Sequence, residues 1–384
     1  MIYLEKYNME HERIRKFRGL EIAMDNLRME SHLLPEGYDT SDLPNKPLEY
    51  FKQYGFKVSS AFPEIYSHHN GIRDDRYVPA SLYFYYINPY LVNMNLSMAY
   101  VDKNMYSRHF PSVRQPETIA HNMAGHFYTG EMVEMTRDEV INRLRHIDRF
   151  IIKPAIESGC GRDVAVINGG GNPRLDEILD NYRADYIIQR LVVQHSTLSH
   201  LNPTSLNTCR LITYRRVGTS DYILLGALVR FGGNGTFIDN SCTGGGFCKI
   251  YDDGKVDDKI HKYRCFGWGS LFEEKGVKNM HIPNYERVVK TALRLHRSIP
   301  YMDLIGWDIA VDAEGEPMLI ELNQYPDCEG FQIANGPMFG DYTDELMERI
   351  SKHHIDPVTV YKRTFDSGRD HYAYNIEIGK AYSI

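Results

Sequence analysis

The sequence predicts an α+β protein built from two or three packed lobes. The chain has 384 residues, which exceeds the usual size of a single hydrophobic core. Segments with helical spacing of apolar residues alternate with short β-rich segments, and no internal repeat or low-complexity run appears. A cleft between lobes is therefore geometrically available to a ligand.

The composition excludes several classes of protein. Hydrophobic residues make up 42% and charged residues 25% of the chain, as in ordinary globular proteins. The net charge of −7 supplies no basic field for a nucleic acid, so nucleic-acid binding is not expected. The six cysteines form no CxxC pair and predict reduced thiols. No apolar run of about 18 residues and no signal-peptide core occurs, which predicts a cytoplasmic protein without a membrane span.

The N-terminal part is expected to form a lobe of its own. Residues 5–31 show helical spacing, and residues 33–47 break it with proline and glycine. Residues 50–95 mix aromatic and turn residues and predict short elements. Pro111 and Pro116 then mark a boundary.

The middle of the chain alternates between helix and strand signals. Thr136 and Glu139 form a capping box that begins a helix. Three strands and a further helix are expected to follow, with the strands at 150–155, 164–168 and 185–193 and the helix at 175–183.

The second half contains longer β segments. Strands are expected at 208–217 and 222–231, an amphipathic helix at 283–299, two closing strands at 304–312 and 317–323, and a last helix at 342–354.

The sharpest chemical pattern lies on the two closing strands. Glu321 and Asn323 are two residues apart, so alternation puts them on one face, and Asp308 on the partner strand can reach that face. Two carboxylates and a carboxamide are hard oxygen ligands that suit Mg²⁺. A hairpin whose acids face solvent is the competing interpretation.

Three basic residues form weaker patterns. Lys153 ends an apolar strand and precedes a loop with Gly159 and Gly161, whose backbone N–H groups can fold over phosphates. Lys103 begins a helix that Asp102 can cap. Arg210 stands before a long strand and can hold a phosphate or carboxylate in a bidentate manner. An edge-strand lysine, a solvated lysine and a structural ion pair are the respective alternatives.

The order of these parts resembles the ATP-grasp superfamily. The segments KNMYSRHFPSVRQPETI, SLNTCRLITYR and GWDIAVDAEGEPMLIELNQYPD are most similar to the sugar-transfer-associated ATP-grasp family found with polysaccharide biosynthesis genes. The resemblance covers about residues 50–335. It implies two α+β lobes that grip ATP, plus an N-terminal lobe.

The resemblance also implies roles for individual residues. Lys103 and Lys153 match the lysines that contact ATP, and Arg210 matches the basic residue at the transferring phosphate, so Lys153 and Arg210 are the catalytic candidates. Asp308, Glu321 and Asn323 match the Mg²⁺ ligands, with Glu321 bridging two ions. The glycine lid corresponds to Glu157, Ser158, Gly159 and Gly161, and the adenine hinge to Gln189, Arg190, Leu191 and Val192. Gln189 stands where the hinge often begins with Glu, and QHSTLSH offers no acid for the ribose hydroxyls.

The implied domains are an N-terminal lobe at 1–114, a small ATP-grasp lobe at 115–195, a large lobe at 196–345 and a tail at 346–384. The implied reaction is ATP- and Mg²⁺-dependent ligation of a carboxylate to an amine through an acylphosphate. The acid is expected to be a sugar acid and the amine an amino acid or small amine. The tyrosine-rich residues 62–92 and the loop 240–250 are candidates for the acceptor pocket.

Two alternatives remain open. A sugar or small-molecule kinase on the same fold would stop at phosphoryl transfer to a hydroxyl. A non-catalytic nucleotide-binding partner of a glycosyltransferase system would not need the three metal ligands together. The oligomeric state is left open, with a homodimer among the options.

Overall fold

The computed structural model describes residues 33–44, 46–156, 163–216, 218–233, 235–237, 244–262 and 267–352. The helix expected at 5–31 and the glycine segment 157–162 lie outside this part of the chain. The final expected helix is present as α15 (Thr343–Lys352), and residues beyond 352 are likewise outside it.

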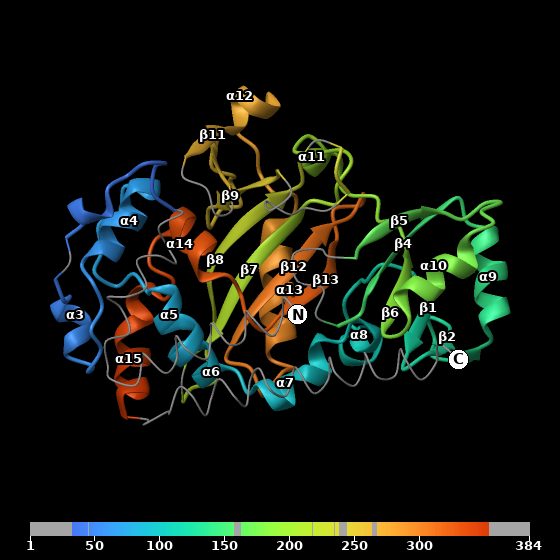
Figure 1. Ribbon diagram of the computed structural model, residues 1–384, viewed down its shortest axis with the longest axis horizontal. Helices are drawn as coiled ribbons and strands as arrows, with labels where there is room; N and C mark the ends of the chain where they lie inside the picture. The colour runs from blue at the N-terminus through green and yellow to red at the C-terminus, as the bar shows by residue number, and fades with distance from the viewer. Residues whose placement is uncertain are drawn as a thin grey trace.

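A six-stranded antiparallel sheet forms one end of the molecule (Figure 1). Its strand order is β3-β2-β1-β6-β4-β5. The strands are β1 (Thr118–Met123), β2 (His126–Tyr128), β3 (Glu134–Met135), β4 (Arg149–Pro154), β5 (Ala165–Asn168) and β6 (Tyr186–Arg190). Helices α9 (Arg137–Arg145) and α10 (Leu175–Tyr182) enclose its smaller hydrophobic core.

The capping box that the sequence predicts at the start of α9 is confirmed. The Thr136 hydroxyl accepts from the Glu139 amide, and the Glu139 carboxylate accepts from the Thr136 amide. β6 is shorter than predicted: it ends at Arg190, whereas the sequence predicts a strand that continues to Val193. Its neighbours β1 and β4 supply no pairing residue beyond that point, so the chain leaves the sheet.

A seven-stranded antiparallel sheet occupies the centre, with strand order β11-β10-β9-β8-β7-β12-β13. The strands are β7 (Thr208–Arg215), β8 (Tyr222–Phe231), β9 (Gly246–Ile250), β10 (Lys259–His261), β11 (Trp268–Ser270), β12 (Leu304–Val311) and β13 (Pro317–Asn323). Every residue of β12 is buried, and the strand lies between β7 and β13. Helix α13 (Tyr285–His296) packs on β7, β8 and β12 through its apolar side.

Short helices form the N-terminal lobe, which begins at the opposite end of the central sheet from the six-stranded sheet and continues below the central sheet (Figure 1). They are α3 (Glu49–Lys52), α4 (Ala61–Asn70), α5 (Ala80–Leu82), the π-helix η3 (Tyr83–Ile87), α6 (Asn88–Leu91) and α7 (Met94–Val101). A short 3₁₀ turn η4 (Lys103–Met105) and α8 (Tyr106–His109) lead toward β1. Helix α14 (Cys328–Asn335) contacts both α4 and β8, so it joins the N-terminal lobe to the sheet.

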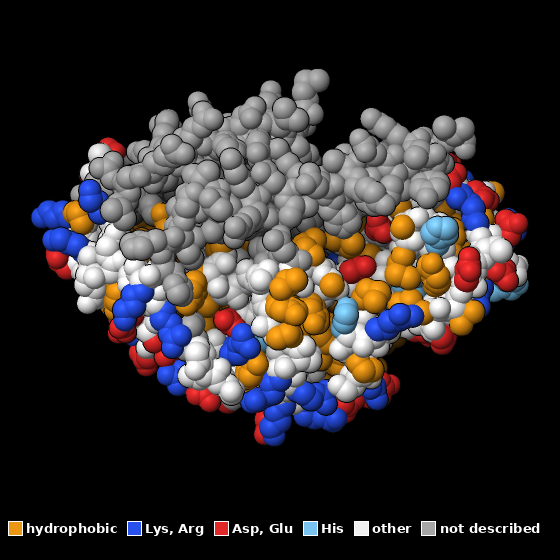
Figure 2. All heavy atoms as spheres, turned by 90° about the horizontal axis from the view of Figure 1, so that it is seen from below, with side chains coloured by type: hydrophobic (Ala, Val, Ile, Leu, Met, Phe, Trp, Pro, Cys, Tyr) orange, Lys and Arg blue, Asp and Glu red, His pale blue; other side chains and the backbone are white. Residues whose placement is uncertain are grey.

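The remaining short elements lie at the edges: η2 (Thr40–Asp42), α11 (Ser196–Ser199), α12 (Leu271–Lys275) and η7 (Gly340–Tyr342). Acidic and basic side chains are interspersed on the described part of the face that Figure 2 shows. No helix within the described ranges is long and apolar enough to cross a membrane.

Candidate functional site

Three neighbouring strands bring the candidate polar residues into one row. Asp308 on β12 pairs directly with Arg210 on β7 and with Glu321 on β13. Directly opposite residues in an antiparallel sheet share a face, so all three side chains project from the same side. Arg210 is the third residue of β7, so it lies within the strand expected at 208–217 and not before that strand.

Asp308 is a buried carboxylate held by two guanidinium groups. Arg210 donates from Nε to Oδ1 at 2.5 Å and from Nη2 to Oδ2 at 2.9 Å, a bidentate pair. Arg230 on β8 donates to both oxygens at 3.2 and 3.3 Å. Burial alone would raise the pKa of Asp308, but the two guanidinium groups outweigh it and lower that pKa to about 2. Asp308 is therefore charged at any physiological pH.

Asn323 lies beside this pair. Its Nδ2 donates to Asp308 Oδ2 at 3.3 Å and to the carbonyl of Gly306 at 3.4 Å. The amide oxygen is thus turned away from Asp308. An oxygen in that position is available to a hard cation.

Glu321 is paired with Lys103, although 218 residues separate them in the chain. Lys103 Nζ lies 2.8 Å from Glu321 Oε1, and the lysine side chain is only 5% exposed. Asp102 caps η4 by accepting from the Asn104 amide, as predicted. The Lys103 amide donates to the Ala155 carbonyl at 3.0 Å, which ties η4 to the end of β4. The backbone of Lys103 is thus bonded two residues along the chain from Lys153.

Lys153 lies on the face of the six-stranded sheet that does not carry the hydrophobic core. It is opposite Ile187 on β6, which is opposite His121 on β1. His121 Nδ1 lies 2.9 Å from Asn104 Oδ1, beside η4. Burial lowers the pKa of His121 to about 4, so this histidine is neutral at physiological pH.

Gln189 shares that face, two residues from Ile187. It is 6% exposed, and its Nε2 makes two long contacts of 3.4 Å to Pro116 and Thr118. Its buried Oε1 has no hydrogen-bond partner among the residues that the structure describes. A buried amide oxygen in this state calls for an external donor.

The segment after Gln189 presents apolar side chains to solvent. Leu191 is 38% and Val193 is 72% exposed, while Val192 is half-buried. Arg190 points away to an ion pair with Glu117, with Nε to Oε1 at 2.8 Å. An apolar connection between the two sheets, next to an unpaired amide oxygen, is suited to a flat ring with hydrogen-bond donors.

The charges around Asp308 and Glu321 argue against a site that binds a metal ion by itself. In the described part of the chain, no group of three His, Cys, Asp or Glu side chains could hold a metal ion. Asp308 and Glu321 are each already paired with cations, namely Arg210, Arg230 and Lys103. The two carboxylates and the Asn323 amide offer hard oxygen donors, but only if the cations find other anions.

Sequence reasoning missed Arg230, and it missed the acids that follow β13. Arg230 has no local motif, and only the pairing of β7 with β8 reveals that it shares a face with Arg210. Asp327 is half-buried, and desolvation together with Glu329 raises its pKa to about 6, while Arg210 acts in the opposite direction. The turn that carries Asp327 therefore lies within electrostatic reach of Arg210.

The cysteines give no nucleophile in the part of the chain described. Cys209, Cys248 and Cys328 are buried thiols without disulfides. Burial raises the pKa of Cys209 to about 12, which keeps it protonated. These three thiols agree with the expectation of reduced cysteines.

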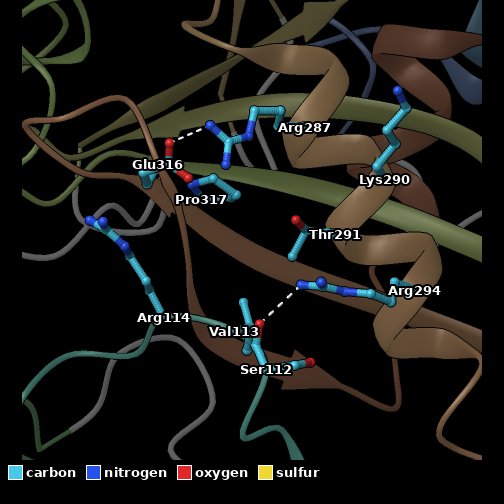
Figure 3. Close-up of a pocket in the computed structure, with 9 residues that line it drawn as sticks. All are labelled: Ser112, Val113, Arg114, Arg287, Lys290, Thr291, Arg294, Glu316 and Pro317. Carbon is cyan, nitrogen blue, oxygen red and sulfur yellow. Dashed lines mark hydrogen bonds and ion pairs between the residues drawn. The ribbon is translucent and has the colours of Figure 1, made fainter.

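A separate cavity of about 410 Å³ lies beside α13 (Figure 3). Its basic side chains already have partners: Arg287 is paired with Glu316, Lys290 with Glu286, and Arg114 with Asp312, while Arg294 donates to the Ser112 carbonyl. Its lining includes none of the residues of the Asp308 row. We therefore interpret this cavity as a gap between packed segments and not as the reaction site.

One comparison with known proteins identifies a family. A family model described as sugar-transfer associated ATP-grasp matches residues 102–344. No curated protein is similar enough in sequence to match the chain.

Similar solved structures are distant. They include a D-alanine–D-alanine ligase from Bacillus anthracis, with 14% identity and a TM-score of 0.37 over 66% of this chain and 68% of that one. They also include the ATP-grasp ligase PsnB with its minimal precursor (14%, 0.38, 67% and 63%) and the VanG D-Ala:D-Ser ligase from Enterococcus faecalis (11%, 0.40, 67% and 63%). The chain spans less than two thirds of the last two proteins, and similarity at this distance does not indicate a substrate.

Proposed function

Because the chain belongs to the sugar-transfer associated ATP-grasp family, we propose that it is an ATP- and Mg²⁺-dependent ligase that joins a carboxylate to an amine. The observation that supports this most is the row of Arg210, Asp308 and Glu321 with Asn323 beside it.

The charge balance of the row favours a metal–nucleotide complex over a metal ion alone. Three cationic side chains, Lys103, Arg210 and Arg230, meet two carboxylates. A bare dication would add positive charge to a cluster that already has an excess. The phosphates of ATP would instead pair with the guanidinium and ammonium groups, leaving Asp308, Glu321 and Asn323 to hold Mg²⁺.

We place the nucleotide between the two sheets. Lys103 and Lys153 would bind its phosphates, and Glu157, Ser158, Gly159 and Gly161 would cover them as a lid. Gln189 would accept from the amino group of the adenine through its buried Oε1, and Leu191 and Val192 would pack against the ring. Arg190 would contribute its backbone, since its side chain points to Glu117.

The proposed reaction has two steps. A carboxylate oxygen of the acid attacks the γ-phosphorus of ATP, and the bond to the β,γ-bridging oxygen breaks to release ADP. The amine nitrogen then attacks the acyl carbon, the C–O bond to phosphate breaks, and the amine loses a proton, which gives an amide and inorganic phosphate.

The side chains would act by position and charge. Mg²⁺, when bound, offsets negative charge on the transferring phosphates. Arg210 and Lys153 would bind the phosphoryl group during transfer, and the lid would exclude water from the acylphosphate.

We further propose that the acid is a sugar acid and that the amine is an amino acid or small amine, as suits the family's description. The boundaries near residues 114 and 195 would separate the lobes, since the strands of the two sheets occupy residues 118–190 and 208–323. The ATP-binding lobes would then hold one sheet each.

The test replaces one carboxylate of the row. Glu321→Ala should reduce phosphate release from Mg-ATP by at least about a thousandfold, with the fold intact, because the site loses a ligand that no neighbour replaces. Glu314→Ala is the matched control, since Glu314 is a largely exposed acid on the turn of the same hairpin. Near-normal turnover in Glu321→Ala would remove Glu321 from the site.

A further inference from the structure

We propose that the N-terminal lobe positions the turn Gln324–Asp327 through three buried side chains, Tyr83, Asn88 and Ser97. The turn begins at the residue after Asn323, the last candidate metal ligand. These three residues precede residues 102–344, the part that the family model matches. The inference rests on the proposed function, because the position of this turn affects catalysis only if the Asp308 row is the reaction site.

The three side chains converge on the turn. Tyr83 donates from its hydroxyl to the Pro326 carbonyl at 2.9 Å. Asn88 donates from Nδ2 to the Gln324 carbonyl at 3.0 Å. Ser97 donates from its hydroxyl to Gln324 Oε1 at 2.7 Å. One short turn thus accepts three hydrogen bonds from three successive elements of the other lobe.

All three donors are completely buried and uncharged at physiological pH. Water therefore does not replace them readily, and the carbonyls of Gln324 and Pro326 depend on them. A buried polar network of this kind fixes one geometry, because each group has few alternative partners.

The π-helix explains how two of the donors reach the turn together. Tyr83 and Asn88 are five residues apart, and in a regular α-helix they would point about 140° away from each other. In the i→i+5 pattern of η3 the Asn88 amide donates to the Tyr83 carbonyl, which brings the two residues closer to one face. Asn88 Nδ2 also lies 3.3 Å from the Tyr83 hydroxyl, so the two side chains do meet on one face.

A displacement of the turn would be transmitted through direct contacts to the candidate metal ligand Asn323. Pro326 lies against Gly306, where an added Cβ would be only 2.9 Å from Pro326 Cβ. The Gly306 carbonyl in turn accepts from Asn323 Nδ2. At its other end, Asp327 accepts from the Glu329 and Gly330 amides and so begins α14. A shift of the turn would therefore displace both Asn323 and the start of α14.

The experiment compares Tyr83→Phe with Tyr77→Phe. Tyr77 is also completely buried in the N-terminal lobe, but among the residues that the structure describes its hydroxyl meets only Asn70 and Ile72. Each variant loses one buried hydroxyl, so both should lose similar thermal stability. Amide hydrogen exchange over residues 324–330 and steady-state kinetics with Mg-ATP are then measured on the full chain.

Tyr83→Phe, and not Tyr77→Phe, is expected to raise exchange at Glu329 and Gly330 about fivefold, as the loss of one buried hydrogen bond predicts. It is also expected to lower kcat about tenfold, with little change in the KM for ATP, because a small displacement reduces the fraction of aligned complexes. Ser97→Ala should reproduce both effects.

Unchanged exchange in the turn, or a kcat equal to that of Tyr77→Phe, would overturn the inference. A wild-type protein that turns over no substrate would instead contradict the proposed function. In that case the exchange data alone decide whether the lobe holds the turn.

Discussion

Asp308→Asn tests whether the two arginines hold a charged carboxylate in the folded protein. The pKa of Asp308 is about 2, compared with an ordinary value of 3.8. That difference corresponds to about 2 kcal/mol of folding free energy at neutral pH, since each pKa unit is worth about 1.4 kcal/mol. The variant should lose at least about this amount, because Arg210 and Arg230 also lose their charged partner.

The pH dependence follows from the direction of the shift. The folded-state pKa is lower than the unfolded value, so the contribution is present above pH 3.8 and is lost as the pH falls toward 2. Over this window the stability of the wild type should fall more steeply than that of Asp308→Asn. The difference between the two proteins should therefore shrink as the solution becomes acidic.

Urea unfolding at pH 6 and at two or three lower pH values measures this difference. Asp303→Asn is the control of opposite sign: burial raises the pKa of Asp303 although Arg215 opposes it. A carboxyl group with a raised pKa costs stability above that pKa, and the cost is relieved as the pH falls. Removing it should make the decline in stability toward acid steeper, not shallower.

Equal pH slopes for the wild type and Asp308→Asn would refute the reasoning. So would a neutral-pH loss of less than about 0.5 kcal/mol, the size usual for a surface substitution. Either result would mean that Arg210 and Arg230 do not stabilise the Asp308 carboxylate in solution.

Three further predictions concern the nucleotide, the metal and the smaller lobe. Lys153→Ala should weaken the binding of a non-hydrolysable ATP analogue by at least about tenfold in calorimetry, through loss of one charge-assisted contact, and unchanged affinity would remove Lys153 from the site. EDTA should stop turnover, and added Mg²⁺ should restore it. Mg²⁺ should also bind at least about tenfold more weakly without nucleotide, because Arg210 and Lys103 are paired with the carboxylates. Equal Mg²⁺ affinity with and without nucleotide would contradict the proposal that the phosphates draw these cations away from the carboxylates. Gly169→Ala should cost about 2 kcal/mol in urea unfolding, since a Cβ there would overlap the carbonyls of Leu144 and Ile147, and a neutral effect would contradict that packing.

The local patterns of the sequence predicted much of the fold. The chain has the α+β ATP-grasp fold that the resemblance implied. The alternation of Glu321 and Asn323 and the short link to Asp308 were enough to put three polar side chains on one face. The capping box at Thr136 and the apolar stripe of α13 likewise identified their helices, because both signals are local.

Long-range pairing could not be predicted in this way. Arg210 meets Asp308 because β7 lies beside β12, although 98 residues separate the two side chains. The role of Arg230 depends on the register of β8 against β7, which sets Arg230 opposite Thr208 and so on the same face as Arg210. Local spacing contains no information on either contact.

The end of β6 and the role of the N-terminal lobe show the same limit. The apolar run through Val193 looked like continued strand, but a strand lasts only as long as its neighbours do. Tyr83 and Pro326 are 243 residues apart, and nothing near either residue marks it as a partner of the other. The lid residues 157–161 lie outside the described part, so their role stays a prediction.

The most direct test of the central claim measures ADP and phosphate release from Mg-ATP with a panel of sugar acids, each with and without a mixture of amino acids and amines. The account predicts phosphate release that requires both an acid and an amine and that disappears in Glu321→Ala. ADP release with a sugar alone and no free phosphate would contradict it in favour of a kinase, and no turnover with any pair would contradict it in favour of a nucleotide-binding protein.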